Sequence, residues 1–445
     1  MLLRFAADNI MSFKEAVEFN TFPSSKSHSH EWHKVSCSHA TALRMSAIYG
    51  ANGAGKSNLL KCISLLKSMV GAEKLGDLAL TDDLYFRLDE QGKTRPSELA
   101  IEFFANGRIF YYHIVFNRQE VVEEELMISQ KNKDIPIFSR KDNDVNVRAE
   151  YLKPGDKVDF IEVFLDAMNR IIRPDMPALS FFGHYYPEEL PLVKDAFDWL
   201  THIQVVLPAM RIGYLPHVLD GDSDFADLVN NVIPELKTGI SRLTVRKEVI
   251  NEEEIRGNSA ISKALAVAKE KPGKPQMLME TRNDEISNIV VEDGIAYLKT
   301  LVAIHADANG RDVEMNMTME SDGTRRLIEY MPLLYAVLKG DNVFVVDEIE
   351  RSIHPIMIKT LMSKISENRE ARGQIIFTTH ESCLLDQSIF RPDEIWFAQK
   401  DVNQSTQLYP LSDYNIHKTA NIENGYLNGR YGGIPFLSNL SDLKW

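Results

Sequence analysis

Eight residues of this chain, GANGAGKS from Gly50 to Ser57, constrain its fold more than any other stretch. They follow an apolar run, Met45 to Tyr49, that predicts a buried strand, and they precede apolar residues at helical spacing from Leu59 onward. The pattern G-x-x-x-x-G-K-[ST] between a strand and a helix predicts a P-loop, whose backbone amides wrap phosphate groups. A chain built around such a loop is expected to fold as an α/β protein with a largely parallel sheet.

The residue types inside this loop fit the binding of ATP and Mg²⁺. Lys56 is expected to neutralise the β- and γ-phosphates, and Ser57 is expected to offer an oxygen to Mg²⁺. A glycine-rich turn that matches by chance is the alternative, which the strand before it and the helix after it disfavour. The full set of nucleotide-binding positions expected here is Gly50, Asn52, Gly53, Gly55, Lys56, Ser57 and Asn58.

Two acidic residues follow a second apolar strand, Val343 to Val346. Ligands of parallel α/β sheets bind outside the carboxyl ends of the strands, which is where Asp347 and Glu348 stand. Asp347 is expected to hold Mg²⁺, and Glu348 is expected to orient and polarise the attacking water. Without a P-loop in the same chain, a strand end with solvated acids would be the better interpretation.

A third apolar strand, Ile375 to Phe377, ends in Thr378, Thr379 and His380. A histidine at the carboxyl end of a core strand can reach a γ-phosphate or the water beside it. A lone histidine is more often structural, so His380 gains its predicted role only from its place beside the other motifs.

Composition narrows the class of protein. The 445 residues include 50 Lys and Arg against 64 Asp and Glu, a net charge of −14, so a broad surface that coats nucleic acid is disfavoured. The net charge does not exclude a local basic groove, because it does not report where the charges lie. The three cysteines form no CxxC pair, and no long uncharged apolar run appears, so a cytoplasmic protein without a membrane span is expected.

The order of patterns along the chain predicts three parts. Residues 1–119 would form the N-terminal part of an ATPase head, with the P-loop and a β-rich lobe that contains a hairpin at Asn106-Gly107. Residues 120–296 would form a mainly helical insertion, with helices over 158–172 and 191–207 and a polar, partly mobile segment over 252–275. Residues 297–445 would complete the head with strands and helices in alternation.

The stretch MESDGTRRL, from Met319 to Leu327, lies one helix before the Asp347-Glu348 strand. A serine hydroxyl, a bare glycine amide and a helix N-terminus together can bind an anion. This order and spacing resemble the signature motif of ABC-type ATPases, although Asp322 departs from that motif and Glu320 stands where a leucine is usual.

Further stretches narrow the resemblance. The opening LLRFAADNIMSFKEAVEF, with IYGANGAGKSNLLKCI, SDGTRRL, VVDEIERSIHP, TTHESCLLD and the closing YLNGRYGGIPFL, resembles ABC-type ATPases of the SMC, RecF and OLD branch. The set is most similar to stand-alone ATPases of prokaryotic antiphage systems, of the RloA, AbiL and PARIS AriA type. The resemblance covers residues 1 to about 115 and 300 to 445, and it implies a P-loop ABC-type head with a mainly parallel sheet and an antiparallel β lobe.

The resemblance also implies roles for individual residues. Glu348 would be the catalytic base and His380 the switch histidine, acting with Lys56. Ser321 and Gly323 would close on the nucleotide of another protomer, so that two heads hold two ATP molecules between them. The loop Ser352 to His354 would cross between protomers.

A histidine-rich stretch, HSHEWHKVSCSH, raises the possibility of zinc. Its spacing matches no zinc pattern closely, and it runs through a polar segment, so a loop is the preferred interpretation. The residues concerned are His28, His30, His33, Cys37 and His39.

Three functions remain in competition at this point, of which the third, a non-enzymatic scaffold that binds ATP but barely hydrolyses it, is disfavoured by the presence of Glu348 and His380. The first is a slow, Mg²⁺-dependent ATPase that acts as the nucleotide-gated sensor or scaffold of an antiphage system, forms homodimers or larger assemblies, and controls a separate effector protein, for instance a nuclease. The second is an ATPase of DNA repair or chromosome maintenance that clamps DNA. The second is disfavoured because residues 120–300 show no sustained heptads and the chain is acidic.

Overall fold

The computed structural model describes residues 1–78, 84–148, 167–208, 214–251, 258–278, 286–414, 416–417 and 420–433. They fall into two compact units. Unit 1 comprises Met1–Pro208, Gly340–Ile349 and Met362–Trp445, and unit 2 comprises Ala209–Lys339 and Glu350–Leu361.

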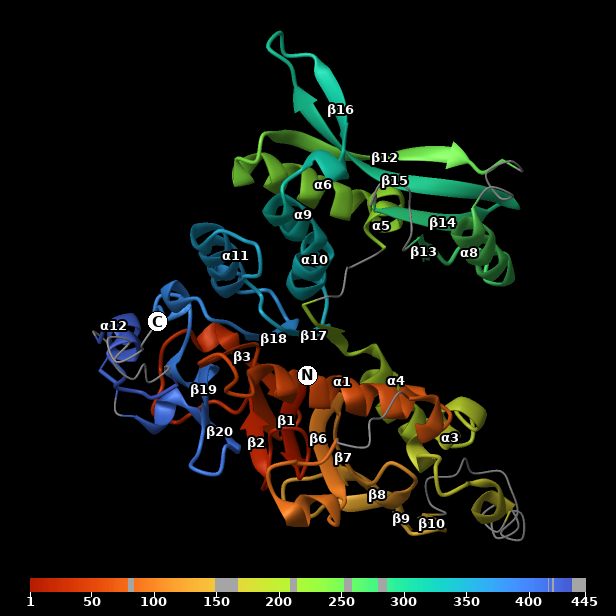
Figure 1. Cartoon of the computed structure of the whole chain (residues 1–445), viewed down its shortest axis with the longest axis vertical. Coiled ribbons are helices and arrows are strands. Elements are labelled where there is room, and N and C mark those ends of the chain that lie inside the picture. Colours follow the sequence, from red (N-terminus) through yellow and green to blue (C-terminus); the bar gives the residue numbers. More distant parts are fainter. Residues whose placement is uncertain are drawn as a thin grey trace, which may run out of the picture. The chain divides into compact units, whose positions relative to one another are not determined.

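A six-stranded sheet lies at the centre of unit 1 (Figure 1). Its first five strands run parallel, and the last pairs antiparallel with its neighbour. Strands β5, β17 and β18 are buried along their whole length, as expected for parallel strands covered on both faces. In spatial order the strands are β11 (Gln204–Val206), β17 (Val343–Val346), β18 (Gln374–Thr378), β5 (Met45–Gly50), β19 (Ile395–Lys400) and β20 (Thr406–Pro410). The predicted α/β class with a P-loop after β5 is therefore confirmed.

A seven-stranded antiparallel sheet forms the second layer of unit 1. The predicted hairpin at Asn106-Gly107 is confirmed: both residues have positive φ, which suits a two-residue turn between paired Ala105 and Arg108. The strands in spatial order are β10 (Asp144–Val147), β9 (Ile135–Lys141), β8 (Val121–Ser129), β7 (Arg108–Phe116), β6 (Ser97–Ala105), β1 (Leu2–Asp8) and β2 (Val17–Asn20), and a separate hairpin consists of β3 (Lys34–Cys37) and β4 (Ala40–Leu43).

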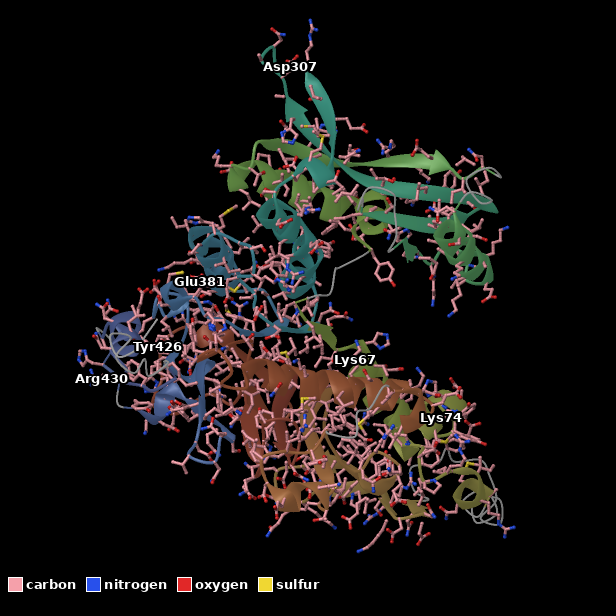
Figure 2. All side chains as sticks on the ribbon, viewed as in Figure 1. Lys67, Lys74, Asp307, Glu381, Tyr426 and Arg430 are labelled. Atoms are coloured by element: carbon pink, nitrogen blue, oxygen red, sulfur yellow. The ribbon has the colours of Figure 1, made fainter. Side chains whose placement is uncertain are left out.

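Four α-helices in the described residues belong wholly to unit 1. They are α1 (Lys56–Gly71), α3 (Ala178–Tyr185), α4 (Pro191–His202) and α12 (Ile422–Leu427). Helices α1, α3 and α4 share one apolar core with both sheets. Helix α12 brings Tyr426, labelled in Figure 2, against Phe397 of β19, with stacked rings 5.6 Å apart. The closing motif YLNGRYGGIPFL therefore begins beside the central sheet, while its residues 434–437 lie outside the described part of the chain.

Helix α3 is capped from another element of the fold. Its own N-cap residue, Pro177, offers no side-chain cap, and the buried carboxylate of Glu124 on β8 takes that place. This carboxylate accepts hydrogen bonds from the amides of Ala178 (2.6 Å) and Leu179 (2.8 Å) and from the hydroxyl of Tyr112 (2.9 Å). Three donors therefore depend on one side chain that is 1% exposed.

Replacing Glu124 with alanine is expected to lower the free energy of unfolding by about 2–3 kcal/mol, because two helix amides and a phenol would lose their partner inside the protein. The midpoint of urea unfolding measures this loss. The matched control is Glu123→Ala on the same strand, where the carboxylate is exposed and its ion pair with Lys141 is worth little. Equal midpoints for both variants would contradict the capping role.

Unit 2 contains a second antiparallel sheet. Its strands in order are β12 (Ile240–Val249), β15 (Ile295–Ala306), β14 (Ser287–Glu292) and β13 (Gln276–Leu278), with β16 (Asp312–Asn316) also paired to β15 (Figure 1). Its helices are α5 (Leu215–Gly221), α6 (Ser223–Val232), α8 (Ser259–Glu270), α9 (Asp322–Glu329) and α10 (Met331–Lys339), and α11 (Pro355–Glu367) starts in this unit and ends in unit 1.

Helices cover both faces of β14. Ile289 and Val291 pack with Leu265 of α8, whereas Asn288, one residue out of phase, accepts a hydrogen bond from the amide of His217 on α5. This alternation follows from the pleat of a strand, which sends successive side chains to opposite faces. Unit 2 therefore has a small core of its own.

The boundaries of the two units differ from the three expected parts. Segment 120–296 holds helices but also strands β8 to β14, so it is mixed in structure and not mainly helical. Strands β8 to β10 extend the antiparallel sheet of unit 1 through hairpin pairing with β7. Residues 297–339 belong to unit 2, because β15 pairs with β12 and β14 and with no strand of the parallel sheet.

Two local expectations also change. The segment around residues 252–275, expected to be polar and partly mobile, contains helix α8, whose first amides are capped by the Asn258 side chain. The end of the stretch 191–207, expected to be helical, is the edge strand β11. Most of the helix expected over 158–172 lies outside the described residues. No helix in the described part of the chain has both the length and the apolar character needed to cross a membrane.

Candidate functional site

The P-loop connects the carboxyl end of β5 to the first turn of α1. Gly50 lies so close to β19 that a Cβ there would come within 2.4 Å of the Ala398 carbonyl oxygen. Gly55 has φ of 99°, and a Cβ at this position would lie only 2.0 Å from the hydroxyl oxygen of Thr406. Both positions therefore require glycine, because neighbouring atoms leave no room for a side chain. Gly55 also requires it because its backbone is left-handed.

Two polar side chains support the loop from behind. The Thr406 hydroxyl of β20 donates to the Ala54 carbonyl at 2.9 Å and lies 2.8 Å from the hydroxyl of Ser12. The Thr406 amide also donates to the Ser12 carbonyl. Segments at both ends of the sequence therefore fix the shape of the loop. Ser12 lies within the opening motif that suggested the family resemblance, but nothing in the sequence near Thr406 marks its role.

Lys56 is 5% exposed and lies over the loop. Its ammonium donates to the carbonyls of Gly50 (2.7 Å) and Ala51 (3.1 Å). Helix α1 has no acidic residue in its first turn and no side-chain cap, so the positive end of the helix faces the loop. Asn52 and Gly53 lie at the exposed tip of the loop, and Asn58 lies in the first turn of α1.

The two predicted metal-binding side chains meet in space. Ser57 donates from its hydroxyl to Oδ1 of Asp347 at 3.0 Å, although 290 residues separate them in sequence. Asp347 is 1% exposed, and its Oδ1 also accepts a bond of 2.5 Å from the hydroxyl of Thr378. This arrangement follows from the strand order, since β18 lies between β5 and β17 and the three strands end at one edge.

Glu348 follows Asp347 in a strained backbone conformation, with φ of 50°. Its amide donates to the Thr378 hydroxyl at 2.8 Å, and the next amide, of Ile349, donates to the Thr378 carbonyl at 3.2 Å. A left-handed conformation in a residue other than glycine is costly and tends to occur where function needs it. The structure therefore places the half-buried Glu348 directly after the buried Asp347, with its backbone held by Thr378.

His380 leaves the end of β18 and keeps an exposed side chain. Surrounding protein atoms lower the pKa of His380 through desolvation, and the positive charge of Lys56 lowers it further, while Glu348 and Asp347 act in the opposite direction. The neutral form of the imidazole is therefore favoured. The same four side chains that the sequence singled out are thus electrostatic neighbours in unit 1.

The signature-like residues lie in unit 2. Ser321 is the N-cap of α9 and accepts a hydrogen bond from the Thr324 amide at 3.1 Å. The Asp322 side chain is 77% exposed and pairs with Arg325 on the same helix. Gly323 is packed so closely on the neighbouring loop that a Cβ there would come within 2.5 Å of the Ser352 carbonyl oxygen.

The loop expected to cross between protomers therefore lies beside the signature-like residues within unit 2. Ser321, Ser352 and His354 are all exposed, and Ser352 has a left-handed backbone with φ of 63°. The predicted site residues thus form two groups. One group surrounds the P-loop in unit 1, and the other forms an exposed surface of unit 2.

A cavity of about 1090 Å³ lies elsewhere in unit 1. It is bounded by Asn342 and Val343 at the start of β17 and by Arg372 just before β18, which places it at the amino-terminal edge of the parallel sheet. Trp32 and Trp199 form two of its walls. None of its lining residues belongs to the P-loop or its two acidic neighbours, so phosphate chemistry is assigned to the opposite edge of the sheet.

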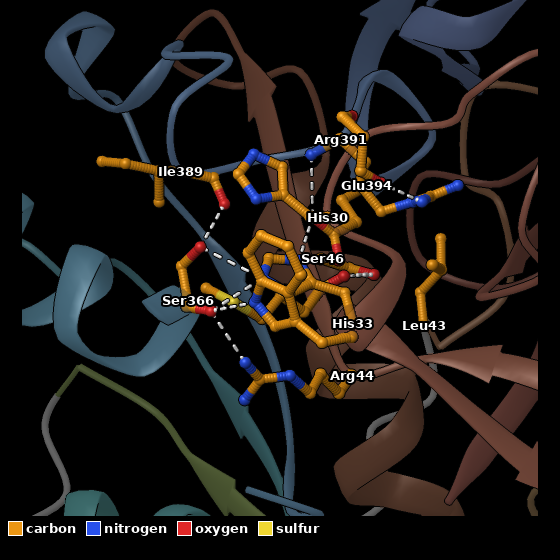
Figure 3. Close-up of polar contacts among 12 residues, drawn as sticks. His30, His33, Leu43, Arg44, Ser46, Ser366, Ile389, Arg391 and Glu394 are labelled. Carbon is orange, nitrogen blue, oxygen red and sulfur yellow. Dashed lines mark hydrogen bonds and ion pairs between the residues drawn. The ribbon is translucent and has the colours of Figure 1, made fainter. Parts of the chain in front are cut away.

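The histidine-rich stretch has a structural explanation (Figure 3). His33 is fully buried, with Nδ1 2.8 Å from a carboxylate oxygen of Glu394 and Nε2 3.0 Å from the hydroxyl of Ser366. The ring of His30 stacks on that of His33, and its Nε2 lies 2.9 Å from the carbonyl oxygen of Gln387. These nitrogens have protein partners, and among the described residues no group of three or more His, Cys, Asp or Glu is arranged to hold a metal ion.

Comparisons with known proteins agree with a P-loop ATPase. A family model described as "AAA domain, putative AbiEii toxin, Type IV TA system" matches residues 45–386, a range that contains β5, the P-loop, Asp347, Glu348 and His380. No curated protein matches the sequence significantly.

Several solved structures are also similar. One is an SmcHead bound to the C-winged helix domain of ScpA, with 13% identity and a TM-score of 0.42 over 92% of this chain and 97% of that chain. Another is the SMC head domain from Thermotoga maritima, with 12% identity and a TM-score of 0.38 over 92% and 98%. A third is an Smc head domain with an extended coiled coil bound to the C-terminal domain of ScpA derived from Pyrococcus furiosus, with 15% identity and a TM-score of 0.37 over 92% and 96%.

Proposed function

This chain belongs to the AAA-domain family whose model matches residues 45–386, and we propose that it is an ATPase that uses ATP binding to control its own assembly and, through it, a separate effector protein. The observation that carries this proposal is the bond between Ser57 and Asp347 beside the P-loop. It joins a hydroxyl and a carboxylate at the edge where the helix start of α1 can receive phosphates.

Each residue of this group has a distinct task in the proposed reaction. The ammonium of Lys56 binds oxygens of the β- and γ-phosphates in place of the loop carbonyls that it contacts here. The carboxylate of Glu348 holds the attacking water and accepts its proton while the bond from the γ-phosphorus to the β–γ bridging oxygen breaks. The imidazole of His380, at the end of β18, can hydrogen-bond the γ-phosphate.

The donor set beside the loop also fits Mg²⁺. Ser57 and Asp347 supply two hard oxygen ligands 3.0 Å apart, which is the ligand type that Mg²⁺ prefers. When bound there, Mg²⁺ would supply positive charge against the β- and γ-phosphate oxygens.

The exposed surface of unit 2 supplies the second half of the proposed site. Ser321, Gly323 and the loop around Ser352 form one continuous patch at the start of helix α9. We propose that this patch closes on the nucleotide held by the P-loop of a second copy. Two copies would then hold two ATP molecules between them, in an arrangement with twofold symmetry.

Mixing two inactive variants tests this arrangement. Lys56→Ala removes the P-loop ammonium, whereas Ser321→Asp keeps a good N-cap for α9 but places a carboxylate where phosphate is expected. Each variant alone should hydrolyse ATP slowly. In an equal mixture, about half of the dimers contain one copy of each variant. Each such mixed dimer has one intact site out of two, so about a quarter of wild-type activity should return.

The control mixture combines Lys56→Ala with Asp347→Ala. Both residues lie in unit 1 and serve the same half of the site, so no mixed dimer contains an intact site and no activity should return. Recovery in the first mixture and none in the second supports closure by a second copy. No recovery in either mixture would show that the signature-like patch does not act across a dimer.

A role in antiphage defence, with a separate effector, is the wider setting that we propose. The family description names a toxin of a toxin–antitoxin system, and such a system has more than one component. Purification together with the product of the neighbouring gene tests this, because an effector under the control of this chain should co-purify and be released when ATP is hydrolysed.

A further inference from the structure

Thr378 lies at the carboxyl edge of the parallel sheet and bonds to both acidic residues. It is the last residue of β18 and is fully buried, and β18 lies between the strand that ends at the P-loop and the strand that ends at Asp347. We infer that Thr378 is a positioning residue, which holds Asp347 and Glu348 in the geometry needed for hydrolysis. This inference rests on the proposed ATPase function.

The hydrogen bonds of Thr378 fix the direction of its single hydroxyl proton. The hydroxyl donates to Oδ1 of Asp347 at 2.5 Å, because the carboxylate oxygen can only accept. Its oxygen then accepts the amide proton of Glu348 at 2.8 Å. One hydroxyl group therefore ties the side chain of the first acidic residue to the backbone of the second.

A third bond of the same residue completes the clamp. The carbonyl of Thr378 accepts the amide of Ile349 at 3.2 Å, so the backbone amides on both sides of the Glu348 α-carbon are held by one residue. Glu348 has a left-handed φ of 50°, a conformation that persists only where the surroundings impose it. Without these bonds, the Glu348 backbone would relax and its carboxylate would move away from the attacking water.

The arrangement at Asp347 supports the same inference. Its Oδ1 accepts from Ser57 as well as from Thr378, so the two hydroxyls hold the carboxylate from the P-loop side and from β18. Rotation of this carboxylate would weaken the metal-binding pair formed with Ser57. Loss of the Thr378 hydroxyl is therefore expected to affect both the reaction rate and the affinity for Mg²⁺.

The neighbouring residue provides a matched control. Thr379, the residue after β18, is also fully buried, but its hydroxyl accepts a hydrogen bond from the amide of Glu381 and not from that of Glu348. Valine has nearly the shape of threonine and lacks only the hydroxyl. Thr378→Val and Thr379→Val thus remove the same group from adjacent positions, and Thr378→Ser restores the group at the first.

The experiment measures kcat and KM for ATP at saturating Mg²⁺, together with the Mg²⁺ dependence of binding of a fluorescent ATP analogue. Thr378→Val should lower kcat about tenfold to a hundredfold with KM within about threefold, and should weaken the apparent Mg²⁺ affinity several-fold. Thr378→Ser should return kcat to within about threefold of wild type, and Thr379→Val should resemble wild type.

Three results would overturn the inference. Wild-type kcat in Thr378→Val would show that the hydroxyl positions nothing, and equal losses in both valine variants would show a general effect of the strand end. A wild-type protein that neither binds nor hydrolyses ATP would refute the proposed function and this inference with it. Active wild type with an active Thr378→Val variant refutes the inference alone, so the two failures are distinguishable.

Discussion

Lys56→Ala is expected to reduce ATP binding and hydrolysis by at least about a hundredfold. The ammonium is buried within the loop and is placed by two loop carbonyls, so it is fixed where the β- and γ-phosphates would lie. Removing this ammonium takes away the positive charge of the protein that would lie nearest to the β- and γ-phosphates. Titration with a fluorescent ATP analogue measures the loss of binding, and release of phosphate measures the loss of hydrolysis.

A control on the same helix separates this effect from general damage. Lys61 is exposed on α1, so Lys61→Ala removes an equal charge from the helix without touching the loop. It should bind and hydrolyse ATP as wild type does. Unchanged binding in Lys56→Ala would contradict the assignment of the P-loop as the nucleotide site.

The parts of the site that are local in sequence could be predicted from it. The P-loop is one continuous stretch with a strand before it and a helix after it, and the structure places Gly50 to Ser57 as expected. The strand Val343 to Val346 and its two acidic residues were also predictable, because an apolar run followed by carboxylates is a local pattern. Their proximity to Ser57 followed from the rule that parallel strands end at one edge.

The parts that depend on pairing between distant segments could not be predicted. Thr378 stands in the quoted stretch TTH, yet only the strand order, with β18 between β5 and β17, reveals that its hydroxyl reaches both acidic residues. Thr406 supports the P-loop from a segment some 350 positions further along the chain. No local pattern encodes such contacts, since they arise only when the sheet is assembled.

The division of the chain was hard to predict for a similar reason. Strand β15 is mostly apolar and continuously buried from Lys299 to Ile304, as a strand of a parallel sheet would be, and nothing in its sequence says whether it joins the parallel sheet or pairs with β12 and β14. The three-residue strand β11 begins two residues after the end of helix α4. Because its apolar run is so short, it looks like a continuation of the helical pattern before it.

Glu348→Gln is expected to lower hydrolysis by at least about a hundredfold while leaving ATP binding intact. Glutamine keeps the size of the side chain and the backbone bond to Thr378, but it cannot accept the proton of the attacking water. Bound ATP would therefore persist, and with it the closed assembly that ATP is proposed to stabilise. The variant should accumulate the state that wild type passes through briefly.

The central claim is that ATP draws two copies of this chain together, and the most direct test is the solution mass of Glu348→Gln with and without ATP and Mg²⁺. The account predicts at least a twofold increase in mass on adding ATP and Mg²⁺, and no increase when Ser321→Asp is present in the same chain. An unchanged monomer with saturating ATP would contradict it. A chain that stays monomeric with ATP but gains mass on adding DNA would favour the DNA clamp instead.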